Sequence, residues 1–131
     1  KRNFGRIINI TSAMVKNPHL IMGLSTSARS GLHGLSKALS REVAQYNITI
    51  NNVLPERIDT DRQTQILNFQ AKLADSTYEE AKKELEETLT AKRMGTVEEF
   101  SGVCTFLCSE QAAYISGQNI SVDGGNSTNL I

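Results

Sequence analysis

The chain has 131 residues, which is enough to bury one hydrophobic core and predicts a single domain or part of one. Its 14 basic and 14 acidic residues cancel, so no whole-chain electrostatic field favours nucleic acid or an anionic membrane as a partner. The longest apolar runs fall far short of the roughly 20 residues that span a bilayer, and no transmembrane segment is predicted.

The first predicted element is a buried strand from Arg6 to Ile10, where β-branched residues are dense. The strand follows closely on Lys1, which is neither an initiator methionine nor the start of a signal-peptide pattern. We therefore expect the chain to be a piece of a longer protein. Two hydroxyl residues, Thr11 and Ser12, end the strand.

A helix is predicted from Ser25 to Tyr46, after a polar loop over residues 16–23. Apolar and small residues recur in it at every third or fourth position, which predicts a helix buried on one side: Ala28, Leu32, Leu35, Leu39 and Val43. Asn47 tolerates the left-handed conformation that ends helices. A second strand is predicted over residues 48–54, and Pro55 stops it.

Residues 59–92 are polar and charged and predict one or two surface helices. Their apolar residues at helical spacing are Tyr78, Ala81, Leu85 and Leu89. The segment 96–99 has the form of a capping box and predicts a helix that runs to about Ser109. A third strand is predicted over residues 118–122, followed by a turn at 123–125.

This alternation of strands and helices predicts an α/β fold in which parallel strands are joined by right-handed crossovers. It corresponds to half of a doubly wound sheet. Ligands of such sheets bind beyond the carboxyl ends of the strands. The segments expected at a site are therefore residues 11–12, 55–60 and 123–125.

The two cysteines, Cys104 and Cys108, lie four residues apart in a predicted helix. We interpret them as two small buried residues on one helix face. The two histidines, His19 and His33, are far from them in the sequence, and zinc usually needs four ligands, so no metal site is predicted. Free cysteines are typical of a reducing, cytoplasmic setting.

Several segments, taken in order, resemble the short-chain dehydrogenase/reductase family. They are residues 5–12, the helix from Ser25, residues 50–55, residues 93–95 and residues 116–125. The resemblance covers nearly the whole chain, and its nearest branch resembles the 3-oxoacyl-(acyl-carrier-protein) reductases. It implies that residues 1–131 are the C-terminal half of a Rossmann-like reductase domain whose N-terminal dinucleotide-binding half is absent.

The resemblance also implies three catalytic positions. In the family a serine after the strand polarises the substrate carbonyl, a tyrosine thirteen residues later transfers the proton, and a lysine four residues beyond lowers the tyrosine pKa and binds the nicotinamide ribose. These positions fall on Ser12, Ser25 and Arg29. An aliphatic hydroxyl is a much weaker acid than a phenol, so Ser25 cannot simply replace the tyrosine. Arg29 keeps a permanent charge and suits binding to ribose or phosphate better than proton relay.

Each of these residues also has a structural interpretation. Thr11 and Ser12 fit the polar end of a strand, and Ser25 fits a helix N-cap. Arg29 fits a solvated helix face, and His33 fits a packed or surface position.

Other residues of the chain are poor substitutes for the missing tyrosine and lysine. Tyr46 lies roughly 30 Å from Ser25 along the predicted helix axis, and Lys37 lies about 12 Å beyond Arg29. Tyr78 and Tyr114 come from other segments, so their approach to the site stays open.

A cofactor, NAD or NADP, is implied by the match of Pro55, Ile58 and Thr60 to the segment that closes over the nicotinamide in the family. Glu56 departs from this pattern, because a glycine usually lets the backbone approach the cofactor there. The glycine-rich phosphate loop belongs to the absent half, so we expect this chain alone to be inactive. The helices after Asp61 correspond to a mobile substrate lid.

The expected function is that of an atypical NAD(P)-dependent oxidoreductase, resembling a 3-oxoacyl thioester reductase, that acts on a small carbonyl or hydroxyl substrate. The resemblance implies a homodimer or homotetramer that pairs through the helix from Ser25 and through the last strand. The alternative is a non-catalytic scaffold or nucleotide-sensing subunit that has lost the proton relay.

Overall fold

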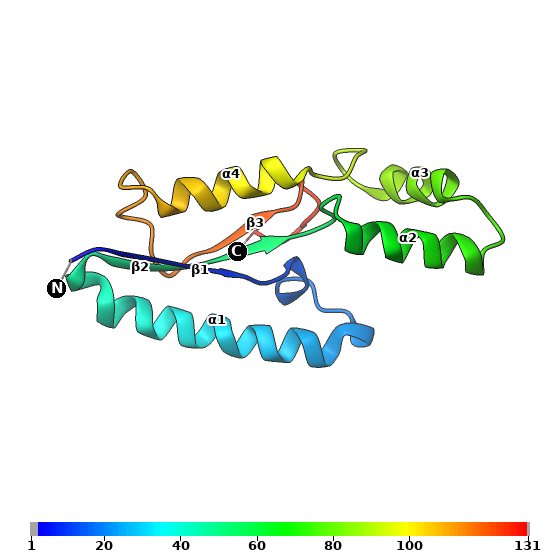
Figure 1. Ribbon diagram of the computed structural model, residues 1–131. Helices are drawn as coiled ribbons and strands as arrows, with labels where there is room; N and C mark the ends of the chain where they lie inside the picture. Colours follow the sequence, from blue (N-terminus) through cyan, green and yellow to red (C-terminus); the bar gives the residue numbers. More distant parts are fainter. Residues whose placement is uncertain (1–2, 131) are drawn as a thin grey trace.

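The computed structural model of the chain describes residues 3–130 and forms a parallel sheet flanked by helices (Figure 1). Its strands are β1 (Gly5–Ile10), β2 (Ile48–Pro55) and β3 (Asn119–Val122). Its α-helices are α1 (Gly23–Val43), α2 (Asp61–Leu73), α3 (Tyr78–Thr88) and α4 (Val97–Cys108). Short 3-10 helices are η1 (Ala13–Val15), η2 (Leu20–Met22) and η3 (Ala44–Tyr46).

The sheet has the order β1-β2-β3, with both pairs of strands parallel. Residues 5–10 pair with 48–53, and residues 52–55 pair with 119–122. The central strand β2 is buried from residue 49 to residue 54, as expected for a parallel strand covered on both faces. The three predicted strands and their parallel arrangement are therefore confirmed.

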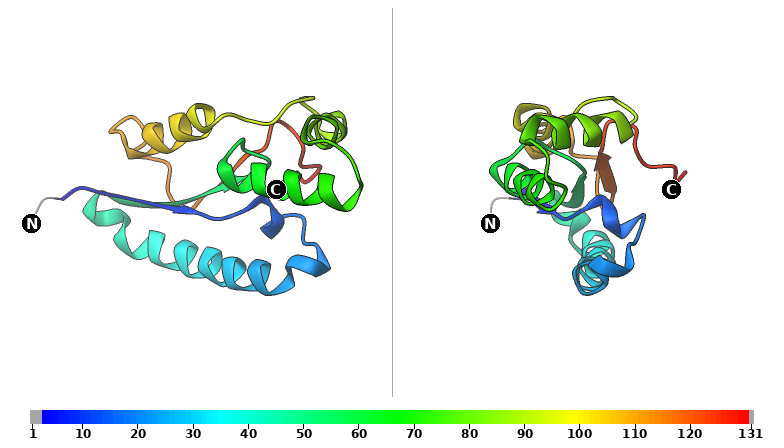
Figure 2. Two further views of the ribbon diagram at one scale, coloured as in Figure 1. Left: turned by 45° about the vertical axis from the view of Figure 1, so that its right-hand side comes forward. Right: turned by 90° about the vertical axis from the view of Figure 1, so that its right-hand side faces the viewer.

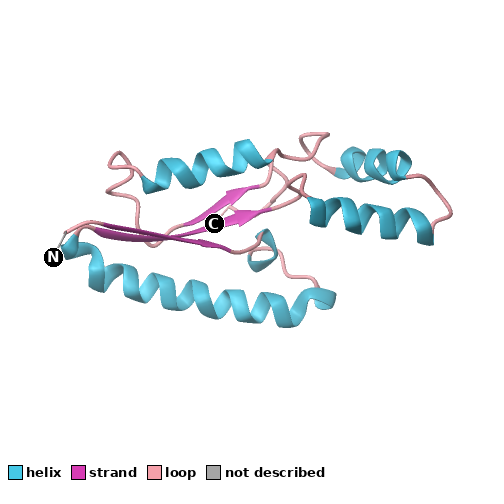
Figure 3. Ribbon diagram, in the orientation of Figure 1, coloured by secondary structure: helices cyan, strands magenta, loops and turns pink. Residues whose placement is uncertain are grey.

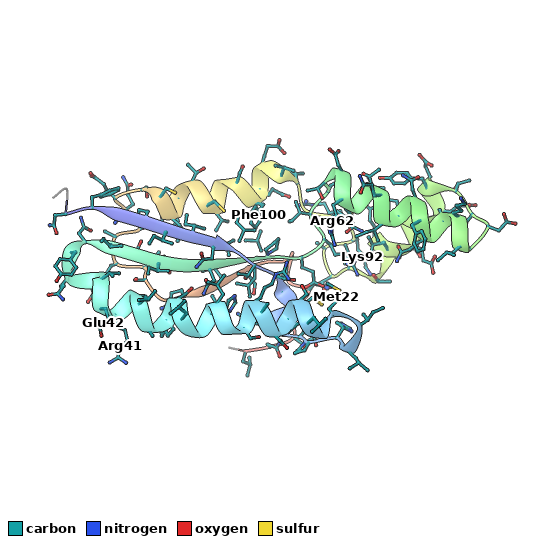
Figure 4. All side chains as sticks on the ribbon, turned by 60° about the horizontal axis from the view of Figure 1, so that its bottom comes forward. Met22, Arg41, Glu42, Arg62, Lys92 and Phe100 are labelled. Atoms are coloured by element: carbon teal, nitrogen blue, oxygen red, sulfur yellow. The ribbon has the colours of Figure 1, made fainter. Side chains whose placement is uncertain are left out.

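Helices α1 and α4 cover opposite faces of the sheet (Figure 2). Helices α2 and α3 lie beside each other beyond the carboxyl ends of the strands (Figure 3). Met22, just ahead of α1, lies at the same end of the molecule as Arg62 and Lys92, whereas Arg41 and Glu42 lie at the other end of α1 (Figure 4). The carboxyl end of the sheet is thus framed by the start of α1 and by the α2–α3 pair.

Two apolar clusters hold these elements together. The first lies between α4 and the sheet and is centred on Val53, Leu107 and Ala112, with Phe100 packed against it (Figure 4). The second joins α2, α3 and the loop before α4. It consists of Leu67, Leu89 and Met94 with Tyr78, Ala81 and Leu85. The second cluster confirms two surface helices with the predicted apolar spacing.

Helix α1 turns a different face to the sheet from the one predicted. Its leucines are substantially exposed, with Leu32 at 37%, Leu35 at 56% and Leu39 at 43%. Its buried residues are Thr26, His33, Ser36 and Ser40. Small polar side chains let the helix lie close to the sheet and bond to polar groups on the strands. The prediction of a buried leucine face was therefore wrong.

An asparagine ladder explains why the sheet accepts a polar helix face. Asn9, Asn52 and Asn119 are in register on neighbouring strands. Asn52 Nδ2 donates to Asn119 Oδ1 at 2.7 Å, and Asn9 Nδ2 donates both to Asn52 Oδ1 and to Ser36 Oγ at 3.0 Å. Buried polar groups require such partners, so Ser36 of α1 completes the ladder.

The predicted helix ends are partly confirmed. Thr96 and Glu99 form a capping box at the start of α4, and Asn47 has a left-handed φ of 55° after η3. Ser25, however, is not an N-cap, because α1 begins at Gly23 with Met22 as its N-cap residue.

The cysteines also differ in part from the prediction. Cys104 packs against the first cluster, and burial raises the pKa of its thiol. Cys108 is exposed, so the expectation that both are buried was wrong for this residue. Within residues 3–130 no group of three or more His, Cys, Asp or Glu residues is placed to hold a metal ion.

Candidate functional site

The segments that follow the three strands meet at one end of the sheet. Asn126 Nδ2, beyond β3, donates to Glu56 Oε1, beyond β2, at 2.9 Å. Asn129 Nδ2 donates to the carbonyl oxygen of Lys16, in the loop beyond β1, at 3.0 Å. These bonds connect the parts of the chain that follow the three strands, next to the segments predicted to form a site.

Ser12 is half-buried and lies directly beyond the carboxyl end of β1. Its backbone is extended, with φ of −168° and ψ of 145°, and its Oγ accepts a hydrogen bond from the Met14 amide at 3.2 Å. A serine hydroxyl that accepts one bond still has its own hydrogen to donate. Ser12 can therefore donate to a polar group beyond the strand.

Ser25 and Arg29 are brought together on α1. Arg29 Nη1 donates to the carbonyl oxygen of Ser25 at 3.3 Å and also to Ser25 Oγ. Both residues are partly buried, so Arg29 is not simply a solvated side chain. The pair offers a permanent positive charge beside a hydroxyl group, which suits an anion or a ribose but includes no group with the acidity of a phenol.

The three tyrosines of the chain are placed elsewhere. Tyr46 ends η3, two residues before β2 begins, and Tyr114 lines a cavity with Asn47 and Ile48, so both lie at the amino end of the sheet. Tyr78 packs into the cluster between α2 and α3. This arrangement provides no tyrosine in the place of the missing phenol.

Lys37 forms a hydrogen bond to a loop and not to the residues at the relay positions. Its Nζ donates to the carbonyl oxygen of Gly117 at 3.1 Å, which links α1 to the loop before β3. It therefore has a structural partner of its own and is not free to take the place of a relay lysine.

The segment 55–60 leads from β2 into α2. Ile58 forms a parallel bridge with Gly95, and Thr60 caps α2 by accepting a hydrogen bond from the Gln63 amide at 3.4 Å. The left-handed backbone falls on Arg57, with φ of 51°, and not on Glu56. Since the Glu56 side chain turns toward Asn126, a glutamate fits where the family has glycine.

Arg93 secures the loop that contacts this segment. It donates to Glu99 through both terminal nitrogens, at 2.8 and 2.7 Å. These hydrogen bonds, with one from the Thr96 amide, hold the pKa of Glu99 at about 2. Arg93 thus anchors the loop.

A cavity of about 230 Å³ lies beyond β2 and β3. Its lining includes Glu56, Ile58, Leu89, Gly95, Val122 and Asp123. Small-molecule sites usually enclose about 300–1,000 Å³. The cavity that the described residues enclose is therefore smaller than a usual small-molecule site.

One pair at this end of the sheet was not predicted from the sequence. Thr11 Oγ1 and His33 Nε2 lie 2.8 Å apart, and both residues are buried. Burial, together with the charge of Lys16, lowers the pKa of His33. His33 is thus packed, as its structural interpretation allowed, but no sequence pattern pointed to Thr11 as its partner.

This lowered pKa predicts that stability falls on mild acidification. The unfolded chain binds a proton near the ordinary value of 6.5, whereas folded His33 binds it only at lower pH. The free energy of unfolding should therefore decrease as the pH falls below 6.5 and level off below the folded pKa. Urea titrations at several pH values measure it. His33→Gln should weaken this pH dependence. The control His19→Gln, at an exposed position, should keep it. An unchanged pH dependence in His33→Gln would show that His33 is not its source.

Comparison with known proteins gives matches along almost the entire chain. A family model described as enoyl-(acyl carrier protein) reductase matches residues 1–127. The NADPH-dependent reductase BacG of Bacillus subtilis is 36% identical over 126 residues, which cover 96% of this chain and 49% of BacG. The 3-oxoacyl-[acyl-carrier-protein] reductase FabG of Aquifex aeolicus is 36% identical over 125 residues, which cover 95% of this chain and 46% of FabG.

Solved structures agree with these matches. YwfH, an NADPH-dependent reductase involved in bacilysin biosynthesis, superposes with a TM-score of 0.89 at 36% identity, covering 98% of this chain and 49% of YwfH. L-sorbose reductase from Gluconobacter frateurii, solved with NADPH and L-sorbose, superposes with a TM-score of 0.91 at 28% identity, covering 98% of this chain and 49% of the reductase. The chain thus spans about half the length of the relatives it matches. Among the described residues, no helix has the length and apolar character needed to cross a membrane.

Proposed function

The chain belongs to the short-chain dehydrogenase/reductase family, and we propose that it forms part of an NAD(P)-dependent oxidoreductase that reduces a carbonyl or oxidises a hydroxyl group. The observation that carries this proposal is the position of Ser12. Its Oγ accepts the Met14 amide at the carboxyl end of β1, which leaves the hydroxyl hydrogen free to polarise a carbonyl oxygen. The similarity to FabG supports a 3-oxoacyl thioester as the first substrate class to test.

Three features of the segment 55–60 and of α1 fit a nicotinamide dinucleotide. Arg29 offers a fixed positive charge for ribose hydroxyl groups or phosphate. Thr60 stands at the N-terminus of α2, where backbone amides favour anionic groups. The Glu56 side chain bonds to Asn126 beyond β3, so a glutamate is accommodated at the position where the family usually has glycine. The reduced dinucleotide would supply a hydride to the carbonyl carbon.

The carbonyl oxygen then requires a proton, and Ser25 and Arg29 include no group with the acidity of a phenol to supply it. Ser25 is held by Arg29, and its hydroxyl can pass on a proton only if water supplies one in return. We therefore infer that water is the proton source and that turnover is slower than with a tyrosine and a lysine at these positions.

The rest of the protein is expected to complete this site. β1 is an edge strand of the described sheet, and its Ile7 and Ile10 are 47% and 64% exposed. An open apolar edge of a parallel sheet calls for a further strand and its helix, which a dinucleotide-binding half would supply. The exposed stripe of Leu32, Leu35 and Leu39 on α1 fits pairing with a second copy, as in a homodimer or homotetramer.

A second function rests on the bond between Arg29 and Ser25. The guanidinium group donates to the Ser25 hydroxyl oxygen at the position where the family has its tyrosine, and neither group has the acidity of a phenol. A protein with this pair could bind a nucleotide without turning over a substrate, as a sensing subunit or scaffold.

The two functions differ in the response to Ser25→Tyr combined with Arg29→Lys in the complete protein. If the proposed enzyme is correct, the native protein reduces ketones or 3-oxoacyl thioesters with NADPH or NADH. The double variant should then raise kcat at least about tenfold, because a positioned general acid contributes roughly 10²–10⁴-fold. The matched control is Ser30→Tyr with Arg41→Lys at exposed positions of α1, which should leave kcat unchanged.

The remaining outcomes separate the alternatives. Turnover by the double variant alone, with cofactor binding by the native protein, would establish the scaffold. Failure of the complete protein to bind either cofactor would overturn both the enzyme and the nucleotide-sensing subunit, and would leave only a scaffold that binds another subunit.

A further inference from the structure

The buried pair of Thr11 and His33 connects β1 to α1 at the level of the candidate site. Thr11 is 6% exposed and His33 is 7% exposed, and the 2.8 Å contact joins residues 22 positions apart. The Thr11 amide also donates to the Val53 carbonyl oxygen at 2.9 Å, which extends the pairing of β1 with β2 by one residue. Thr11 is therefore held on its backbone by the sheet and on its side chain by the helix.

His33 lies on the same stripe of α1 as the two residues at the relay positions. It follows Arg29 by four residues and Ser25 by eight, which places it about 6 Å and about 12 Å from them along the axis. On the other side of the contact, Thr11 immediately precedes Ser12 in the chain. This buried hydrogen bond joins α1 to the residue next to Ser12, whereas the other bond between β1 and α1, from Asn9 to Ser36, lies three residues before Ser12.

We propose that Thr11 and His33 are the positioning pair for Ser12, acting by fixing its hydroxyl group relative to Ser25 and Arg29. The inference rests on the proposed oxidoreductase function and extends it to two buried residues that would act through Ser12. Loss of the bond removes a tie at the start of the turn from Ser12 to Met14. The turn then keeps the Met14 amide on Ser12 Oγ at 3.2 Å and the Val15 amide on the Ser12 carbonyl oxygen at 3.1 Å. A misplacement of about 1 Å can cost 10²-fold in rate.

The test compares single, double and conservative variants of the complete protein. His33→Leu and Thr11→Val should each lower kcat about 10- to 100-fold, with KM and the cofactor Kd changed by less than about threefold. His33→Gln and Thr11→Ser keep a hydrogen-bonding group at each position and should recover most of kcat. If His33→Leu leaves kcat unchanged, the proposal is wrong.

The double variant Thr11→Val, His33→Leu separates positioning from stability. Each single variant leaves one buried polar group without its partner. Replacing both residues with apolar ones removes that cost, so the free energy of unfolding should return toward that of the native protein. Under the proposal kcat stays low, because the bond that fixes Ser12 is still missing. Recovery of kcat together with stability would show a purely structural role and overturn the inference.

Hydrogen exchange at the Met14 amide gives a readout that does not depend on turnover. This amide should exchange faster in His33→Leu than in the native protein, and at the native rate in His33→Gln. Such a result supports the positioning role even if the complete protein reduces none of the substrates tested, in which case only the proposed function fails. Equal exchange in the native protein and in His33→Leu would overturn the positioning role on its own.

Discussion

Ser12→Ala is expected to lower kcat/KM of the complete protein about 10²- to 10³-fold, the usual effect of removing one donor to a developing oxyanion. Ser12 Oγ already accepts the Met14 amide, so its single hydrogen is the group available to a substrate oxygen. Alanine keeps the extended backbone but has no donor. Steady-state kinetics with the substrate found active for the native protein measures the change, and titration with NADPH should show unchanged cofactor binding.

Ser101→Ala is the matched control for this experiment. Ser101 is exposed on α4, and its hydroxyl donates to the carbonyl oxygen of Glu98. Its replacement should leave kcat/KM unchanged. Retention of activity within about threefold in Ser12→Ala would exclude Ser12 as the carbonyl donor.

The parallel sheet was predictable because its signals are local. β-branched runs predicted β1 and β2, Pro55 ends the second of them, and Asn47 has the left-handed backbone expected between helix and strand. The order of elements then required parallel pairing, and the register of β1 with β2 and of β2 with β3 confirms it. These features depend on residues close together in the sequence.

The orientation of α1 could not be predicted from the same kind of signal. Periodicity showed a leucine stripe, and a leucine stripe usually faces a core. In the structure Ser36 bonds to Asn9 and His33 contacts Thr11, so these polar partners select a neighbouring face of the helix instead of the leucine stripe. Those partners are 22 and 27 positions away along the chain, and no local pattern reports them.

The candidate site was predicted in outline only. Counting from Ser12 located Ser25 and Arg29, and the structure brings these two together on α1. The contact between Thr11 and His33 depends on how the strand and helix pack, which the sequence alone does not determine. The roles of Ser12, Ser25 and Arg29 stay predictions until variants are measured.

Leu107→Ala is expected to lower the free energy of unfolding by about 3 kcal/mol, within the 2–5 kcal/mol typical of a buried leucine. Leu107 is 1% exposed and packs with Val53 and Ala112 between α4 and the sheet, where a cavity would have little room to collapse. The loss should raise the unfolded fraction about 100-fold, because each 1.4 kcal/mol is a factor of ten. Urea unfolding of the complete protein measures this free energy. The control is Leu73→Ala, because Leu73 is 72% exposed on α2, and its free energy of unfolding should stay within about 0.5 kcal/mol of the native value. Equal effects at the two positions would show that α4 does not pack on the sheet as described. The packing of α4 could then not be what holds β2 and β3 in place.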